Sequence, residues 1–360
     1  MSNSKGVIAL GFLVGVAVVA GILRIKFYFN PPEDRFTNRV NEILTTALTE
    51  PVVVEDEPAT VVSNTAKVVP TVQTSAAYVS GVTTNLGEGI LLSLLPESAG
   101  ASAVVLRGSE LMLQRYDSTW QLIPDSVQTI QSDVQLIAGS PPIAKLFSAT
   151  DGYYLVLTQG QTDTQSVLLL QLATDGTVQT DTTLLTNLSP LVEIITTVTS
   201  NAVWVSVADG SLYRFALTDG SLQAMEEFSW VDARVRVCAL IPDETNLIVV
   251  SENATELVFA KQTEFGVNTQ SVSIPRPDLL VACDQIVRQQ ERLVIQLQDR
   301  IVPYSDNLSD QYPELRLTGS ELYPFAVLSS TGLWLASSTS STLGQYTMQV
   351  QEYVTPVAAE

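Results

Sequence analysis

The sequence predicts an all-β protein: a single β-propeller of about six four-stranded blades, preceded by one N-terminal transmembrane helix, a short amphipathic helix and an extended linker. Three observations predict it. Short β-rich runs recur after residue 84, Asp-Gly pairs separate several of them, and an unbroken apolar run opens the chain. We assign residues 1–29 to the membrane anchor, 30–50 to the amphipathic helix, 51–83 to the linker and 84–360 to the propeller.

The anchor is predicted from residues 7–23, VIALGFLVGVAVVAGIL, which contain no charged or polar side chain. About 20 helical residues at about 1.5 Å each span the roughly 30 Å hydrocarbon core of a bilayer. The run ends in RIKFYFNPP, where Arg24 and Lys26 suit lipid headgroups and the aromatic residues suit the interface. A removable signal peptide has a shorter apolar stretch and a small-x-small site soon after it, so we expect a retained signal-anchor.

Small residues follow one face of this helix. Gly11 and Gly15 form a GxxxG motif, and Ala17 and Gly21 repeat the spacing. Such residues let a second membrane helix approach closely, so these four predict helix packing with a partner. The preceding SKG is similar to the trimming site of pilin-type precursors. That resemblance implies a surface filament subunit as an alternative, although the acidic residue that bacterial pilins carry early in the helix is missing.

The two signals for membrane orientation disagree. Arg24, Lys26, Arg35 and Arg39 favour a cytoplasmic C-terminal side. The body is poor in lysine and rich in Ser, Thr and Gln, as exported domains often are. We weigh composition above the charge count and expect a single-pass protein whose propeller is extracytoplasmic, in the periplasm or at the cell surface.

Residues 30–83 change character at Pro51. After Pro31 and Pro32, acidic residues favour a helix start, and apolar residues recur at helical spacing at Phe36, Val40, Ile43, Leu44 and Leu48. From Pro51 to about Val82, Pro, Thr, Val and acidic residues mix without helical period. We expect an extended tether there, or a strand-like segment laid along another subunit.

The body repeats. Six β-rich runs, AVVL, YLVL, VWVS, LIVV, LVIQ and LWLA, begin at Ala103, Tyr154, Val203, Leu247, Leu293 and Leu333. A spacing of about 40 to 50 residues with several strands in each unit is typical of propeller blades. The third unit is the clearest, with four expected strands in residues 191–230 and Asp-Gly pairs at 209–210 and 219–220. The second unit carries Asp-Gly pairs at 151–152 and 175–176.

Ring closure explains why such units come together, because each four-stranded blade has two apolar faces that only its neighbours can cover. Six units fit residues 84–358, with EGILLSLLP at 88–96 as the first strand of unit one. Seven blades would need strands from the Val-rich linker. Another all-β arrangement stays a further alternative.

Residues 210–223, GSLYRFALTDGSLQ, resemble the repeat of quinoprotein-like propellers. A similar sequence pattern occurs in scaffold propellers that bind no quinone, such as outer-membrane assembly factors. The tryptophan-docking spacing of the enzymes is not repeated, since the four tryptophans occupy inconsistent places in their units. The resemblance therefore implies the fold and not the activity.

Composition excludes several functions. The chain has a formal charge of −20, and residues 84–360 carry twelve Lys/Arg against thirty-one Asp/Glu, a surface that repels nucleic acid. It contains no histidine, which removes Ser-His-Asp and Cys-His catalysis. Nucleotide, hydrolase-elbow and EF-hand motifs are missing from the sequence.

Few residues suggest a site. We predict no cofactor, no catalytic residue and no dedicated metal site; calcium at Asp163, Asp181 and Asp209 is a weaker alternative, because loop aspartates are usually solvated. Cys238 and Cys283 fall at matching places in the first strands of successive blades. They form a disulfide if the body is exported, or remain buried thiols, which we prefer.

These observations favour a non-enzymatic accessory, scaffold or assembly subunit of a larger membrane complex. Its partners would be the membrane, through the N-terminal helix, and other protein subunits. The alternatives are a carbohydrate-binding propeller, a carboxylate-dependent enzyme propeller, or a pilin-like filament subunit.

Overall fold

The computed structural model describes residues 65–73 and 77–354, except 133, 135–141, 162–163, 190–191, 208–210, 219–220, 230–235, 244–245, 263–267, 278–282, 290, 298, 318–321, 330–331 and 343–344. The predicted anchor, the amphipathic helix and the first part of the linker lie outside this range. No helix among the described residues is long and apolar enough to cross a membrane.

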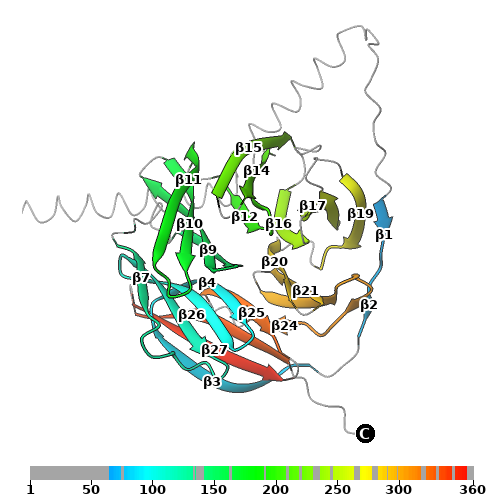
Figure 1. Ribbon diagram of the computed structural model, residues 1–360. Helices are drawn as coiled ribbons and strands as arrows, with labels where there is room; N and C mark the ends of the chain where they lie inside the picture. Colours follow the sequence, from blue (N-terminus) through cyan, green and yellow to red (C-terminus); the bar gives the residue numbers. More distant parts are fainter. Residues whose placement is uncertain are drawn as a thin grey trace, which may run out of the picture. The chain divides into compact units, whose positions relative to one another are not determined.

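The described chain is a six-bladed β-propeller, as the sequence predicted (Figure 1). The strands that each blade takes from consecutive residues run antiparallel and follow chain order outward from the centre. Blades 1 to 3 consist of four consecutive strands each. Their strands are β4 (Ile90–Glu97), β5 (Gly100–Arg107), β6 (Glu110–Asp117) and β7 (Gln128–Gln131); β8 (Ile143–Ala149), β9 (Gly152–Gln161), β10 (Thr164–Ala173) and β11 (Val178–Leu188); and β12 (Ile194–Val198), β13 (Ala202–Val207), β14 (Ser211–Thr218) and β15 (Ser221–Ser229).

Blades 4 to 6 follow the same plan and also receive strands from the segment that precedes blade 1. Their own strands are β16 (Arg236–Asp243), β17 (Asn246–Glu252), β18 (Glu256–Gln262) and β19 (Asn268–Pro275); β20 (Cys283–Gln289), β21 (Arg292–Leu297), β22 (Arg300–Ser305), β23 (Asp310–Gln311) and β24 (Leu315–Arg316); and β25 (Leu322–Leu328), β26 (Gly332–Thr342) and β27 (Gln345–Val354).

The six β-rich runs of the sequence are the second strands of the six blades, β5, β9, β13, β17, β21 and β26. This strand is the most buried because it has a neighbour on each side within its blade and a blade against each face; β13, for example, is buried at every position. That is why these runs lack the period-2 alternation of a half-exposed strand.

The Asp-Gly turn at 151–152 is confirmed in blade 2, and the one at 175–176 ends β10. Gly152 has φ 146°, and a Cβ there would lie 2.1 Å from the carbonyl oxygen of Leu172. A residue with a side chain cannot hold this turn without moving the neighbouring strand. The pairs at 209–210 and 219–220 lie outside the described residues.

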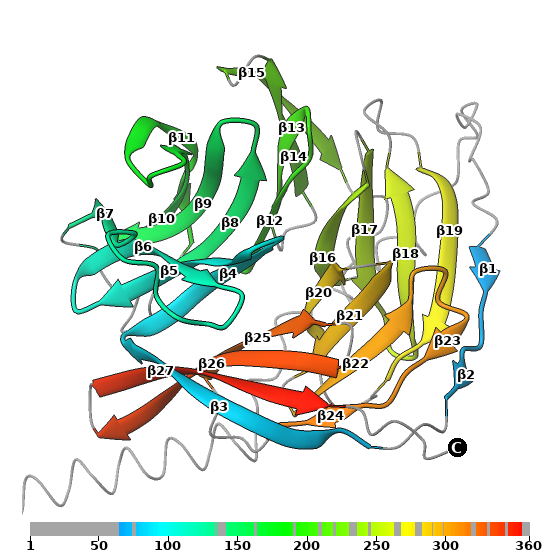
Figure 2. The same cartoon turned by 60° about the horizontal axis from the view of Figure 1, so that its bottom comes forward.

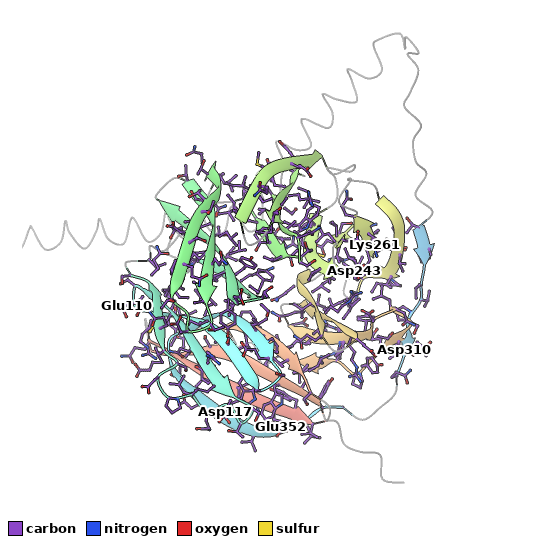
Figure 3. All side chains as sticks on the ribbon, viewed as in Figure 1. Glu110, Asp117, Asp243, Lys261, Asp310 and Glu352 are labelled. Carbon is purple, nitrogen blue, oxygen red and sulfur yellow. The ribbon has the colours of Figure 1, made fainter. Side chains whose placement is uncertain are left out.

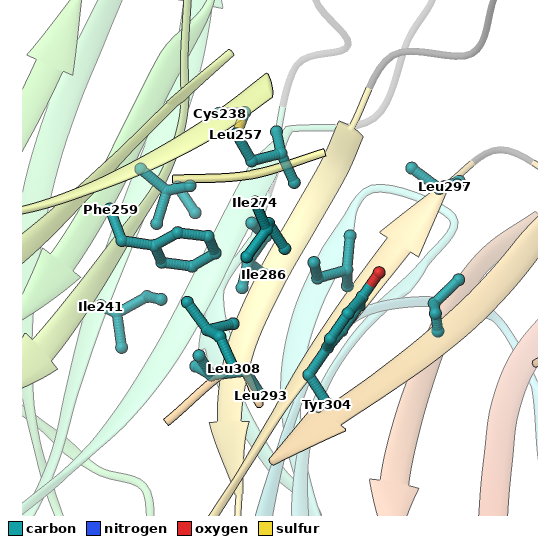
Figure 4. Packing of buried hydrophobic residues seen from close by; sticks show 14 residues of the cluster. Cys238, Ile241, Leu257, Phe259, Ile274, Ile286, Leu293, Leu297, Tyr304 and Leu308 are labelled. Carbon is teal, nitrogen blue, oxygen red and sulfur yellow. The ribbon is translucent and has the colours of Figure 1, made fainter. Parts of the chain in front are cut away.

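A buried apolar cluster fills each of the six blade interfaces. The cluster between blades 4 and 5 brings Phe259 and Ile274 against Leu293 and Tyr304 (Figure 4). Between blades 6 and 1, the Trp120 and Trp334 rings lie 5.9 Å apart at their centroids. Removing these apolar faces from water is what holds the ring together.

The segment before blade 1 closes the ring. β3 (Val79–Glu88) pairs antiparallel with β27 and forms the outermost strand of blade 6. The first and last parts of the propeller thus share one sheet, so both chain ends of the domain contribute to the same blade. β3 begins five residues before the predicted boundary at 84, so blade 6 contains residues that we assigned to the linker.

Two shorter strands precede β3. β1 (Thr65–Lys67) pairs parallel with β19 of blade 4, and β2 (Thr71–Val72) pairs parallel with β23 of blade 5. Figure 2 shows β1 beside β19 and β2 beside β23, along the outside of the two blades. This part of the predicted linker is strand-like, as expected, and it lies along the chain's own propeller. We call residues 65–73 the strap.

Candidate functional site

The central channel is a concave feature lined by strands of all six blades. The innermost strands of blades 1 to 5 and Phe325 of blade 6 enclose a cavity of about 480 Å³. This volume falls in the range of small-molecule sites. The innermost strands surround the cavity because each has a paired neighbour on its outer side only.

Among the described residues, three charged side chains line the channel: Lys145 from β8, Glu193 just before β12 and Arg288 from β20. Glu193 accepts from Nε and Nη2 of Arg236 at 2.9 and 2.5 Å. Arg288 donates to Asp243 at 3.1 Å and to Asp306 at 2.7 Å. Two of the three charges therefore have counter-ions within the protein.

Lys145 differs from both. Its Nζ donates to the backbone carbonyl of Thr196 over 3.4 Å, and no described carboxylate lies within ion-pair distance of it. Burial lowers the pKa of Lys145 to about 8, because the low-polarity surroundings disfavour the ammonium form. At pH 7 the group is still mostly protonated.

Apolar and neutral polar groups complete the lining. Leu94, Phe147 and Phe325 are among the apolar lining residues, and the buried Thr196 and Thr197 follow one another in β12. Glu193 is the one carboxylate among the described lining residues. The described lining therefore does not bring together the pair of carboxylates that a glycosidase needs.

Charged networks near the channel join neighbouring blades. Arg236 of blade 4 also contacts Glu252 at 2.7 Å, and these carboxylate hydrogen bonds raise its pKa. Asp243 of blade 4 forms an ion pair with Lys261 at 2.7 Å, and Figure 3 shows the two residues close together. Asp243 also forms an ion pair with Arg288 of blade 5. The hydrogen bond from Lys261 lowers the pKa of Asp243. These pairs tie blades 3, 4 and 5 together.

Exposed valines mark a second candidate surface on the outside of blades 4 to 6. Val69, Val72, Val79 and Val82 have 73%, 61%, 56% and 64% of their surface exposed. The segment around them is held in place: Lys67 pairs with Glu256 at 2.6 Å, and Gln73 donates to Asp310 at 2.7 Å. We call these four residues the valine rim.

The structure describes some of the predicted site residues and not others. Gly11, Gly15, Ala17 and Gly21 lie outside the described residues. Cys238 is buried in β16, and Cys283 begins β20, so both occupy first strands as expected. The side chain of Cys283 is outside the described residues, and the pairing stays a prediction.

The calcium alternative also stays a prediction. Asp181 lies exposed in the outer strand β11, while Asp163 and Asp209 are outside the described residues. No group of three potential metal ligands occurs among the described residues.

Sequence reasoning did not single out the channel lysine or the valine rim. The signal for Lys145 was present, since Lys145 and Lys261 are the only lysines after residue 84. The signal for the rim was the Val- and Thr-rich sequence of residues 68–84, which predicts a tether or a strand but does not show which side chains remain exposed.

No family model matches the sequence, and no curated protein does. Among solved structures the chain is similar to the CNH domain of AfRom2, with 10% identity, coverage of 75% of this chain and 99% of that one, and a TM-score of 0.40. It is similar to a chain of an S. cerevisiae complex of Dbp5 with Nup159 and Gle1, with 10% identity, 79% and 99% coverage and a TM-score of 0.38.

A third similar structure is BBS1N in complex with ARL6DN, with 12% identity, 75% and 79% coverage and a TM-score of 0.41. At these TM-scores the likeness carries no argument about function. The comparisons show no similarity to PQQ-type propellers, so that resemblance is supported no further than the propeller fold itself.

Proposed function

We propose that this protein is a membrane-anchored, non-enzymatic scaffold or accessory subunit that binds other subunits of a membrane complex through its propeller. The valine rim carries the proposal. Apolar side chains on an ordered segment lose little conformational entropy when a partner covers them, and exposed apolar surface marks contact sites.

The position of the rim within the chain adds to this. The strap begins at Thr65, so residues 51–64 are what remains of the predicted linker between the amphipathic helix and the propeller. Fourteen residues reach about 50 Å at most. If residues 7–23 anchor the chain, Thr65 stays within that reach of residue 50, and the strap is accessible to other subunits of the same complex.

The test uses the full chain with a C-terminal tag, extracted in mild detergent. A photo-reactive residue at Val72 or Val82 should cross-link to a co-extracted subunit, whereas the same residue at Val178, an exposed valine of blade 2, should not. Replacing the four rim valines by serine should release the partners, while serine at Val127 and Val178 should retain them.

A tagged chain that elutes as a monodisperse monomer in mild detergent would contradict the proposal. Equal cross-linking from Val178 and from the rim would assign the contact to another surface. Deleting residues 7–23 tests the anchor separately: we expect the protein to leave the membrane fraction while the tag still recovers a folded propeller.

A further inference from the structure

The channel holds a positive charge that no described carboxylate balances. Glu193 and Arg288 are occupied by Arg236 and by Asp243 and Asp306, which leaves Lys145 as the described lining charge without a counter-ion. This is notable in a chain with a formal charge of −20, where carboxylates are abundant. A half-buried ammonium whose described partner is one carbonyl at 3.4 Å is poorly compensated, and an anion that enters the channel would improve its surroundings.

The remaining lining selects the kind of anion. A phosphate dianion is bound best by several donors or by an arginine fork, whereas the described channel offers one uncompensated ammonium. The apolar lining residues Leu94, Phe147 and Phe325 suit a hydrocarbon or aromatic body. A monoanion with an apolar body therefore fits the lining better than an inorganic anion.

We propose that the central channel binds a small organic carboxylate, whose oxygens pair with the Lys145 ammonium and whose apolar body lies against Leu94, Phe147 and Phe325. The cavity of about 480 Å³ is large enough for such a ligand. This inference does not depend on the scaffold proposal, because the channel and the valine rim are formed by different strands.

Phenylacetate is a suitable probe and phenylacetamide its neutral isostere, and calorimetry on the detergent-solubilised full chain would measure both. We expect phenylacetate to bind and phenylacetamide to bind at least tenfold more weakly. Lys145→Met should weaken phenylacetate about tenfold to a hundredfold, since it removes a charge-assisted hydrogen bond. Lys145→Arg should keep most of the affinity, and Lys67→Met, at an exposed lysine of the strap, should not change it.

The pH dependence gives an independent readout. Binding needs the carboxylate ionised and Lys145 protonated, so affinity should be constant between about pH 5.5 and 7 and fall about tenfold per unit well above pH 8. Lys145→Met should abolish this dependence. The variant should remain folded, because an apolar side chain of similar length replaces a half-buried charge; its melting temperature checks this.

Four results would overturn the proposal: no phenylacetate binding at millimolar concentration, equal binding of the amide, unchanged affinity in folded Lys145→Met, or inorganic phosphate binding more tightly than phenylacetate through Lys145. The last would identify the channel as a site for small inorganic anions instead.

Discussion

Blades 1 to 3 and blades 4 to 6 contain similar four-stranded units but obtain their strands differently. Each of the first three is built from consecutive residues, whereas each of the last three accepts a strand from residues 65–88. The pairings of β1, β2 and β3 span more than 200 residues of sequence. The comparison teaches that the segment before blade 1 both closes the ring and reinforces the half that the chain completes last.

The two halves also meet at two different seams. Between blades 6 and 1 the contact is aromatic, with Trp120 against Trp334. Between blades 3 and 4 the apolar cluster around Trp204 is joined by the ion pair of Glu193 with Arg236. The seam between blades 6 and 1 is therefore mainly hydrophobic, whereas the seam between blades 3 and 4 combines apolar packing with an ion pair.

Truncation of the segment before blade 1 should have the largest effect on the stability of the propeller. Removing residues 1–88 takes away the outer strand of blade 6 and the strands on blades 4 and 5, and we expect loss of a single cooperative unfolding transition. Removing residues 1–62 should leave the transition intact. Circular dichroism melts and size-exclusion chromatography distinguish the two, and an unchanged melt for the longer truncation would show that β3 is dispensable.

At the seam between blades 6 and 1, Trp120→Ala should lower the free energy of unfolding by about 3–5 kcal/mol, because it empties a buried aromatic site. Urea unfolding measures this. Trp120→Phe, which keeps a ring against Trp334, is the matched control and should cost clearly less. A cost below about 1 kcal/mol for the alanine variant would mean that this contact does not hold the ring closed.

A double-mutant cycle sharpens the contrast between the halves. Leu155→Ala in blade 2 and Ile274→Ala in blade 4 should each cost about 2–5 kcal/mol, since both side chains are fully buried. Val68 of the strap packs against the cluster that contains Ile274. Val68→Ala should therefore couple with Ile274→Ala by about 0.5 kcal/mol or more and be additive with Leu155→Ala. Additivity in both cycles would deny the strap a role in blade 4.

Asp243→Asn should cost about 1–2 kcal/mol at pH 7, because it weakens the contacts with Lys261 and Arg288 at a partly exposed site. The lowered pKa of Asp243 fixes the sign of the pH dependence. Its contribution is complete above the ordinary carboxyl pKa of about 4 and is lost as pH falls through the lower folded value. The stability gap between wild type and variant should therefore close towards pH 2 in denaturant titrations; a gap that widens on acidification would contradict this assignment.

The smallest effect is expected at the surface of the strap. Lys67 pairs with Glu256 while its side chain is 62% exposed, and such pairs contribute about 0–1 kcal/mol. Lys67→Ala should lower the free energy of unfolding by no more than that, and the difference should disappear in 1 M salt. A larger loss, insensitive to salt, would indicate that Lys67 contributes through packing and not through charge.

The blade repeat can be predicted from the order of the amino acids alone. Buried second strands such as VWVS at Val203 and LIVV at Leu247 must be apolar on both faces, and that requirement is local enough to be read from composition and spacing. The same runs predicted the number of blades, and the first-strand positions of Cys238 and Cys283 followed from the same spacing.

Three features depend on the folded ring: where residues 65–88 lie, which charges in the channel have counter-ions, and which valines stay exposed. Strand pairing across more than 200 residues leaves no periodic trace, because the extended Val- and Thr-rich text of the strap is compatible with many sheet edges. Likewise, nothing in the sequence around Lys145 shows that Glu193 is engaged by Arg236, since such pairings are properties of the closed ring.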